Sequence, residues 1–221
     1  DFEPVIRAAA GTGLPVILST GVSTAEEVDA AIGWFRDTAA TPDIRDRLIL
    51  MHCVSAYPAP IEEANTLSIP YLAERTGLRV GYSNHIVGPE ACLAAVALGA
   101  CIIEVHFTDC KTGREFRDHA LSCDPDDLAG LVEMVPRIRA SLGQPGKERQ
   151  PSELPNLSAV RKGVVAARDL EAGRVLARDD LMFARPADEV PAAEIDSLQG
   201  ARLKAAVGKG ELIRRNNLER D

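Results

Sequence analysis

Short apolar runs alternate with helix-like segments through the first two-thirds of the chain, and this alternation limits the possible folds more than any other feature. The runs lie at residues 15–19, 48–53, 78–83 and 101–107. Helix-like segments follow them at about 24–37, 65–76, 89–98 and 125–142. Buried strands that alternate with helices are typical of a parallel sheet. We therefore expect an α/β fold in this part of the chain.

Two architectures fit this alternation, a doubly wound sheet and a βα barrel. Polar residues gather just after the predicted strands, which favours the barrel because barrel active sites lie at the carboxyl ends of the strands. A closed barrel needs eight strand–helix units, whereas residues 1–142 hold four, and the sequence opens on a helix-like stretch. We therefore expect residues 1–142 to form the C-terminal half of a TIM (β/α)8 barrel in a longer protein.

The pattern changes after residue 142. Residues 143–158 are polar and rich in breakers, which is typical of a linker. After them, short β-like runs at 163–167 and 181–184 alternate with turns, including a glycine turn at 208–210. We expect residues 159–221 to form a second, small and β-rich domain.

The charge balance and the cysteines exclude some classes of protein. With 33 acidic residues against 25 Lys or Arg, a formal charge of -8 and a pI of about 5.1, a basic nucleic-acid-binding face is not expected. No apolar run approaches the roughly 20 residues of a membrane helix, so no membrane partner is expected. Five cysteines without a C-x-x-C pair, and an acidic start without a signal-peptide pattern, predict reduced thiols in a cytoplasmic protein.

Two of the four histidines follow neighbouring predicted strands. His85 comes just after the third strand, and His106 lies near the end of the fourth. Because adjacent parallel strands are about 4.8 Å apart, the two imidazoles can reach one ion. Two imidazole nitrogens with water and substrate oxygens suit Mn²⁺ or another divalent cation. The alternative is a pair of structural histidines held by hydrogen bonds, and the spacing alone does not decide between these hypotheses.

Polar loops after the strands supply further candidates. Ser55 and Tyr57 stand in a proline-rich loop, where they are suited to hold a polar substrate, although prolines also stiffen loops that bind nothing. Asp118 ends a long polar loop, and such loops are often functional, although a solvated charge cluster gives the same pattern. Gly11-Thr12-Gly13 precedes a strand instead of following one, so dinucleotide binding is not expected.

Taken together, these segments resemble the sialic acid synthase family, which also includes the legionaminic and pseudaminic acid synthases. The resemblance covers nearly the whole chain, and the order and spacing of the motifs agree. The matching stretches are 16–21, the His-Cys-x-Ser-x-Tyr-Pro-x-Pro run at 52–60, Gly-Tyr-Ser-Asn-His at 81–85, 103–108, Asp118-His119 and 164–167.

The resemblance implies a TIM barrel followed by an antifreeze-like (SAF) domain. It also implies that phosphoenolpyruvate condenses with an N-acylated amino sugar such as N-acetylmannosamine, which releases phosphate and gives a nonulosonic acid such as N-acetylneuraminate. By likeness, His85 and His106 bind the metal, Mn²⁺ or Mg²⁺, which acts as a Lewis acid on the sugar aldehyde. The catalytic candidates are thus His85, His106 and Asp118, and the substrate-binding candidates are Ser55, Tyr57, Ser83, Asn84 and Arg185.

The resemblance divides the substrate-binding candidates between two ligands. Ser55 and Ser83 match positions that bind phosphoenolpyruvate, whereas Tyr57, like Asp118, matches a position that contacts the sugar. Arg185 matches an arginine of the SAF domain that reaches the sugar's acyl group in the site of the partner subunit, which implies a domain-swapped homodimer.

Two departures from the family pattern matter. Asn84 stands where the family commonly has Asp, so one negative charge is missing beside the first metal histidine. The lysines that the family places on earlier strands are absent from this sequence, and Lys111 is no obvious substitute, so we expect the chain alone to be inactive. A non-catalytic sugar-binding or assembly module is the alternative to an enzyme, and a metal-dependent aldolase or hydrolase is a weaker one.

Overall fold

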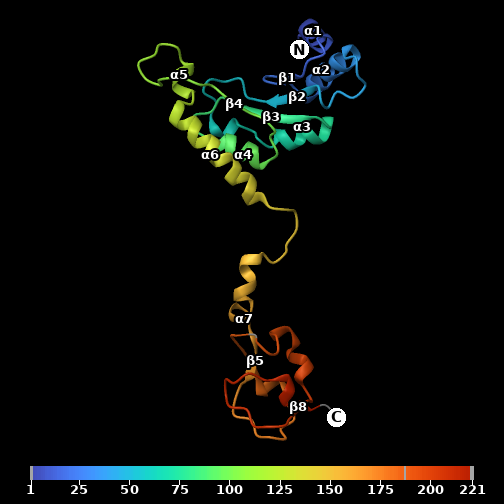
Figure 1. Ribbon diagram of the computed structural model, residues 1–221, viewed down its shortest axis with the longest axis vertical. Helices are drawn as coiled ribbons and strands as arrows, with labels where there is room; N and C mark the ends of the chain where they lie inside the picture. Colours follow the sequence, from blue (N-terminus) through green and yellow to red (C-terminus); the bar gives the residue numbers. More distant parts are fainter. Residues whose placement is uncertain (1, 187, 220–221) are drawn as a thin grey trace. The chain divides into compact units, whose positions relative to one another are not determined.

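A computed structural model describes residues 2–186 and 188–219 of the chain (Figure 1). The chain divides into two compact units between Gln144 and Pro145. The expected linker at 143–158 is partly helical, since the 3₁₀ helix η2 (Pro151–Asn156) and the start of α7 (Leu157–Val160) lie in it. Pro151 occupies the first turn of η2, where its missing N–H costs nothing. The linker limits therefore stay a prediction.

The sheet of the first unit has four parallel strands in the order β1-β2-β3-β4. Each strand pairs with the next along the chain, so that Leu50 lies opposite both Leu18 and Val80. A doubly wound sheet would reverse its strand order at a switch point, and the described strands do not. The fold is α/β as expected, and the sequential order of its strands is compatible with part of a barrel. The strands are β1 (Val16–Ser19), β2 (Leu48–His52), β3 (Arg79–Asn84) and β4 (Ile103–Val105).

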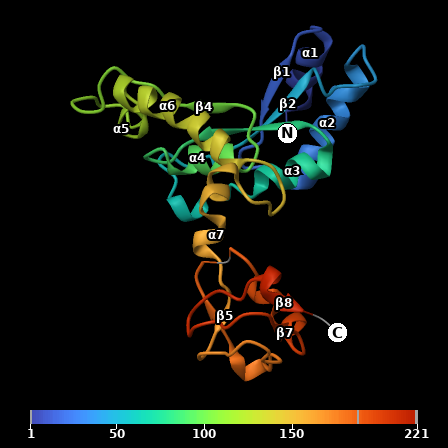
Figure 2. The ribbon, with the colours of Figure 1, turned by 60° about the horizontal axis from the view of Figure 1, so that its bottom comes forward.

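Helices follow the strands and cover one face of the curved sheet (Figure 2). The capping box at the start of α2 uses Thr24 and Glu27. Asp124 caps α6 in the same way, and Gly77 ends α3 in the left-handed conformation. The helices are α1 (Glu3–Gly11), α2 (Ala25–Thr38), α3 (Ser68–Thr76), α4 (Glu90–Ala97), the single turn α5 (Asp118–Leu121) and α6 (Pro125–Leu142).

The two faces of the sheet differ in what covers them. Because side chains alternate along a strand, Leu48, Leu50 and Val80 point towards the helices and are buried there. Their neighbours point to the other face, where Ile17 is 54% exposed and Ser19 and Glu104 are also exposed. The uncovered face therefore carries both apolar and polar side chains.

The second unit has short strands around its own small core. β5 (Gly163–Ala166) pairs antiparallel with β6 (Leu181–Ala184), and β7 (Arg202–Leu203) pairs with β8 (Leu218–Glu219). Besides η2 and α7, the described part of this unit contains the 3₁₀ helices η3 (Arg178–Asp180), η4 (Ala192–Leu198) and η5 (Arg215–Asn217). The core holds Val164, Leu198 and Ile213, and the β-rich character expected for this region is present.

The sequence predicts reduced cysteines and no membrane-spanning helix. All five cysteines are free in the structure, and the reduced state expected from the sequence stays a prediction. Among the described residues, no helix has the length and apolar character that crossing a membrane requires.

Candidate functional site

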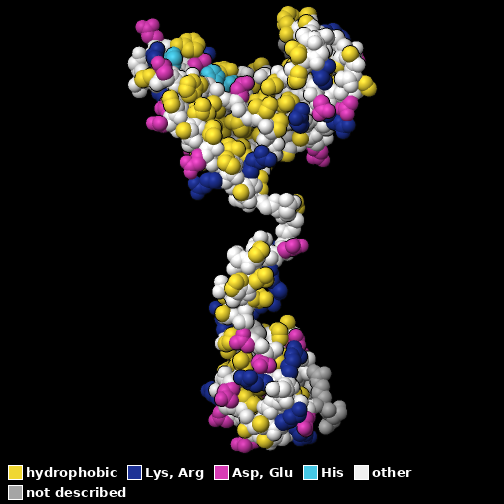
Figure 3. Space-filling model, in the orientation of Figure 1, with side chains coloured by type: hydrophobic (Ala, Val, Ile, Leu, Met, Phe, Trp, Pro, Cys, Tyr) yellow, Lys and Arg dark blue, Asp and Glu magenta, His cyan; other side chains and the backbone are white. Residues whose placement is uncertain are grey.

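The candidate site lies at the carboxyl ends of β3 and β4, where two histidines meet. His85 follows β3 directly and His106 follows β4. Their ring centroids are 5.3 Å apart and the rings stand nearly perpendicular. Figure 3 shows histidine side chains reaching the surface at this end of the first unit. The two imidazoles therefore share one region, as their positions at neighbouring strand ends predicted.

Each of these rings turns its Nδ1 atom towards an oxygen. Nδ1 of His85 is 2.6 Å from the carbonyl oxygen of Val54, and Nδ1 of His106 is 3.6 Å from Oδ2 of Asp118. Because a carbonyl oxygen can only accept, Nδ1 of His85 carries a proton, and in the neutral ring the lone pair is then on Nε2. Histidines that ligate metals commonly have this arrangement. The two side chains therefore fit a divalent cation bound through Nε2.

The metal site that these residues could form is an open one. Within the described residues, no group of three or more His, Cys, Asp or Glu side chains could hold a metal ion. A cation on His85 and His106 would therefore take its remaining ligands from water or substrate oxygens, which suits Mn²⁺ and Mg²⁺. The two-histidine metal site stays a prediction at this point.

Tyr57 forms a wall of the same region. Its ring centroid is 4.3 Å from that of His85 and 5.7 Å from that of His106. The loop after β2 holds it there, because the N–H of Ala59 donates to the carbonyl oxygen of His85 over 2.8 Å. The structure thus places Tyr57 beside both histidines, and its role in sugar binding stays a prediction.

Asp118 presents a buried oxygen atom that has no hydrogen-bond partner among the described residues, although Nε of Arg117 lies 3.6 Å from it. Its Oδ1 makes no hydrogen bond within the described part of the chain, although the atom is fully buried. A buried acceptor that lacks a donor costs about 1–3 kcal/mol. A ligand hydroxyl or a water molecule beside His106 would satisfy this oxygen.

Ser83 and Ser55 lie on the open side of the sheet. The Ser83 hydroxyl donates to Oε1 of Glu104 over 2.6 Å, because β3 and β4 place these residues opposite each other. Ser55 lies against Gly21 of the loop after β1, and a Cβ at Gly21 would overlap the Ser55 hydroxyl oxygen. Sequence reasoning did not single out Glu104, although its position two residues before His106 puts both on one face.

Asn84 does not join the other candidates. It lies between Ser83 and His85, so the alternation of the strand points it to the opposite face. Its Nδ2 donates to the carbonyl oxygen of Ile86 over 2.8 Å, and its Oδ1 accepts from the Tyr82 hydroxyl over 3.2 Å. Substrate binding by Asn84 would therefore need this turn to rearrange.

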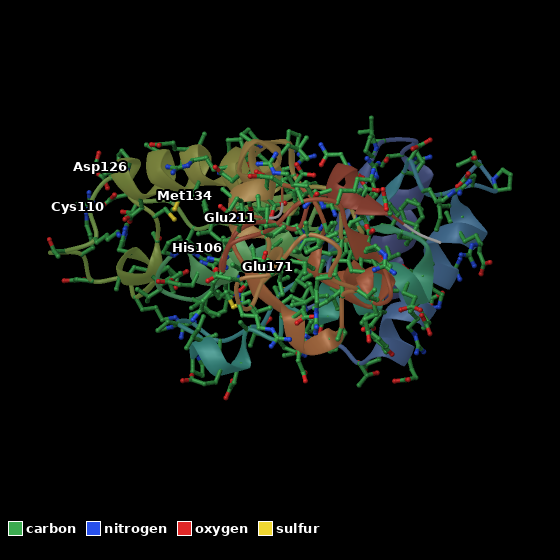
Figure 4. The ribbon with its side chains drawn as sticks, turned by 90° about the horizontal axis from the view of Figure 1, so that it is seen from below. His106, Cys110, Asp126, Met134, Glu171 and Glu211 are labelled. Atoms are coloured by element: carbon green, nitrogen blue, oxygen red, sulfur yellow. The ribbon has the colours of Figure 1, made fainter. Side chains whose placement is uncertain are left out.

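The loop after β4, residues 109–117, lies against the start of α6, where Cys110 and Asp126 are neighbours in Figure 4. In this loop, Lys111 forms ion pairs with Asp127 and, over 3.7 Å, with Asp124. The hydrogen bond to Asp127 raises the pKa of Lys111. Its charge is thus paired with the two carboxylates at the start of α6, and the expectation that Lys111 is no substitute for the family's lysines stays a prediction.

Arg185 belongs to the second unit. It follows β6 and is exposed, and no hydrogen bond or ion pair engages its guanidinium within residues 2–186 and 188–219. An unpaired guanidinium has all its donors available for a ligand. Its predicted role in a partner's site stays a prediction.

Comparison with known proteins decides the family. The NeuB family model matches residues 1–147, and the SAF domain model matches residues 161–219. This chain belongs to the NeuB family. The resemblance drawn from its motifs is thereby confirmed, because relatives of the NeuB-family chain carry the names of legionaminic, pseudaminic and sialic acid synthases.

The curated relatives of this NeuB-family chain come from distant organisms. An N,N'-diacetyllegionaminic acid synthase of Legionella pneumophila is 33% identical over 98% of the chain and 60% of the relative. A pseudaminic acid synthase of Helicobacter pylori is 32% identical over 82% of the chain and 52% of the relative. An N-acetylneuraminate-9-phosphate synthase of Drosophila melanogaster is 29% identical over 97% of the chain and 63% of the relative. The chain spans about three fifths of the length of such relatives.

Solved structures agree with the family assignment. An N-acetylneuraminic acid (sialic acid) synthetase from Leptospira borgpetersenii is 39% identical, with a TM-score of 0.61 over 69% of the chain and 51% of the other protein. A spore coat polysaccharide biosynthesis protein E from Chromobacterium violaceum is 26% identical, with a TM-score of 0.67 over 98% of the chain and 64% of the other protein. The NeuB-family chain thus shares its fold with both.

Proposed function

We propose that this chain supplies the metal-binding and sugar-binding part of a nonulosonic acid synthase. In the reaction, C3 of phosphoenolpyruvate bonds to the aldehyde carbon of an N-acylated amino sugar such as N-acetylmannosamine, water adds at C2, and phosphate leaves. The product is a nonulosonic acid such as N-acetylneuraminate. The relatives support this class of product, since they are named as legionaminic, pseudaminic and N-acetylneuraminate-9-phosphate synthases.

In this proposal, the sheet of the first unit is the C-terminal half of a TIM barrel, and the second unit is its SAF domain. The sequential order of parallel strands supports the barrel. So does the position of the candidate residues, because barrel enzymes build their active sites at the carboxyl ends of the strands.

The observation that carries the proposal is the meeting of His85 and His106 beside the orphaned oxygen of Asp118. Nε2 of His85 is left available because Nδ1 donates to the carbonyl oxygen of Val54, and Nδ1 of His106 lies 3.6 Å from the Asp118 carboxylate, so that its Nε2 can face the same ion. When bound here, Mn²⁺ or Mg²⁺ supplies Lewis acidity towards an aldehyde oxygen. Oδ1 of Asp118 accepts a hydrogen bond from a sugar hydroxyl, which relieves its unpaired state.

The other side chains of the open face hold the two substrates. Tyr57 packs on both histidines and forms a wall against the sugar. The Ser55 hydroxyl donates to phosphoenolpyruvate. The Ser83 hydroxyl does so when it turns away from Glu104, which accepts its single proton in the free chain.

Arg185 leads to a proposal about the oligomeric state of the enzyme. Its free guanidinium donates to the acyl group of the sugar in the partner's site, so the enzyme is a homodimer with exchanged second units. The free state of the five cysteines supports a cytoplasmic enzyme.

A chimera tests the proposal. The chain is joined behind the segment of the Legionella relative that it does not match, and phosphate release from phosphoenolpyruvate is measured with Mn²⁺ and candidate amino sugars. We expect phosphate release that depends on the sugar and is abolished by His106→Ala. A sensible control is Arg137→Ala, because Arg137 lies on α6 and pairs loosely with Glu133 in solvent.

A folded chimera that releases no phosphate with any amino sugar would contradict the proposal. Should that chimera still bind amino sugars in a titration, the alternative of a sugar-binding module would replace it.

A further inference from the structure

Arg117 brings a positive charge to the candidate site that the sequence motifs did not indicate. Its guanidinium lies over the ring of Tyr57, 5.5 Å from the centroid, on the residue that packs against His85. Its Nε is 3.6 Å from Oδ1 of Asp118, which is too long for a hydrogen bond. No side chain or carbonyl group in the described ranges accepts a hydrogen bond from it, and its side chain is 71% exposed.

The other cations of the same loop are already paired. Arg114 forms an ion pair with Asp109 over 2.6 Å, and Lys111 is held by Asp124 and Asp127. Within the described residues, the only ion pair of Arg117 is the 3.6 Å contact of its Nε with Asp118. Arg117 is therefore the most loosely paired cation of this loop, and its terminal nitrogens are available to a ligand at the histidine pair.

The atoms beside Arg117 limit what that ligand can be. Oδ1 of Asp118 is a buried acceptor without a donor, and it needs a hydroxyl or another proton donor. The neighbouring guanidinium offers a fork of N–H donors that matches a phosphate or carboxylate. A ligand that satisfies both groups carries a hydroxyl and an oxyanion close together.

We propose that Arg117 is the anion-recognition residue of this site and selects a sugar that bears an anionic group, a phosphate ester or a carboxylate. This inference rests on the proposed function in one respect, namely that the ligand of the site is a sugar. Phosphoenolpyruvate also carries oxyanions, but it has no hydroxyl to donate to Asp118. The sugar is therefore the source of the anion that the geometry favours.

Calorimetric titration of the 221-residue chain tests the inference. The probes are N-acetylmannosamine 6-phosphate, N-acetylmannosamine, phosphoenolpyruvate and inorganic phosphate. We expect the sugar phosphate to bind more tightly than the neutral sugar. Arg117→Met should weaken binding of the sugar phosphate by about tenfold or more, because a charge-assisted hydrogen bond is lost, and should change binding of the neutral sugar by less than about twofold.

Two control variants show whether a loss of binding comes from the guanidinium of Arg117 itself, from the loss of any positive charge, or from misfolding of the loop. Arg114→Met removes a cation from the same loop and should leave all affinities within about twofold, because Arg114 already faces Asp109. Arg117→Lys keeps the charge but loses the fork, so it should restore part of the affinity. Added salt should weaken binding of the sugar phosphate in the parent chain more than in Arg117→Met.

Three results would overturn the inference: equal binding of the phosphorylated and neutral sugars, an Arg117→Met variant that binds the sugar phosphate like the parent, or an equal loss in Arg114→Met. A loss confined to phosphoenolpyruvate would overturn the assignment to the sugar. These titrations do not depend on turnover, so a failure of the condensation assay with an intact Arg117 effect would contradict the proposed function and not this inference.

Discussion

At the scale of single residues, the neighbours of each ring nitrogen decide what the two histidines can do. The sequence placed His85 and His106 at adjacent strand ends, and the structure brings them together. The sequence could not indicate that Val54 would offer its carbonyl oxygen to His85, because that contact depends on how the loop after β2 folds back. Arg117 was missed for the same reason, since only the path of a long loop brings it over Tyr57.

Asp180 is the residue on which the second unit depends most. It is fully buried, and it accepts hydrogen bonds from Arg168, Arg174 and the N–H of Ala177. Asp180→Ala should therefore lower the free energy of unfolding of this unit by about 2–4 kcal/mol, since it leaves the Ala177 N–H without a partner. Asp179→Ala, at the exposed neighbouring position, should cost less than about 0.5 kcal/mol. Chemical denaturation of both variants checks this, and equal midpoints would contradict it.

The Asp180 carboxylate also makes the stability of the second unit depend on pH in the acid range. Burial alone would raise the pKa of Asp180, but the Ala177 N–H and the two arginines outweigh it and lower the pKa from 3.8 to about 2. Because the folded-state pKa is depressed, the stabilisation is complete above about pH 4 and is lost as the pH falls towards 2. In Asp180→Asn this decline should be smaller, and an unchanged acid denaturation curve would contradict the assignment.

At the scale of elements, the sequence predicted the strands and helices of the first unit well, because apolar alternation and capping residues act locally. The helix predicted from Asn65 begins instead at Ser68, and part of the expected linker forms η2 and α7. Prolines at 151 and 155 look like breakers in the sequence, yet the fixed φ of proline also suits the first turn of a helix. Short 3₁₀ segments lack the long periodic pattern that identifies helices in a sequence.

Close packing across the sheet makes Gly81 the most sensitive position in β3. A Cβ there would lie 2.9 Å from the carbonyl oxygen of Ile102 and would overlap the sulfur of Met51. Gly81→Ala should therefore destabilise the first unit by about 1–3 kcal/mol. Gly33→Ala, inside α2 with nothing near its Cβ, should instead stabilise it by up to about 1 kcal/mol. Thermal unfolding of both variants measures the difference, and two shifts of the same sign would contradict this packing.

At the scale of the whole molecule, the exposed surface of the first unit indicates how the chain behaves alone. β1 and β4 each pair on one side only within the described sheet, and the face opposite the helices exposes Ile17. Figure 3 also shows apolar side chains gathered over the region of α4 and α6. Unpaired strand edges and exposed apolar faces favour association.

We therefore expect the chain alone to self-associate and to show no synthase activity. Light scattering after size-exclusion chromatography should give masses above that of one chain, and Ile17→Lys should reduce them, because a charge on the uncovered face opposes pairing. Val132→Lys, on the exposed surface of α6, should have the smaller effect if the open sheet is the site of association. A monodisperse monomer with robust turnover would contradict this expectation.

If His85 and His106 jointly bind one divalent cation, titration of the chain with Mn²⁺ should show it directly. We expect one Mn²⁺ per chain, with affinity reduced by at least about tenfold in His85→Ala and in His106→Ala. His119→Gln should bind as the parent does, since Nδ1 of His119 is engaged by the Thr108 hydroxyl over 2.7 Å. Mn²⁺ binding that survives removal of both His85 and His106 would contradict the proposal.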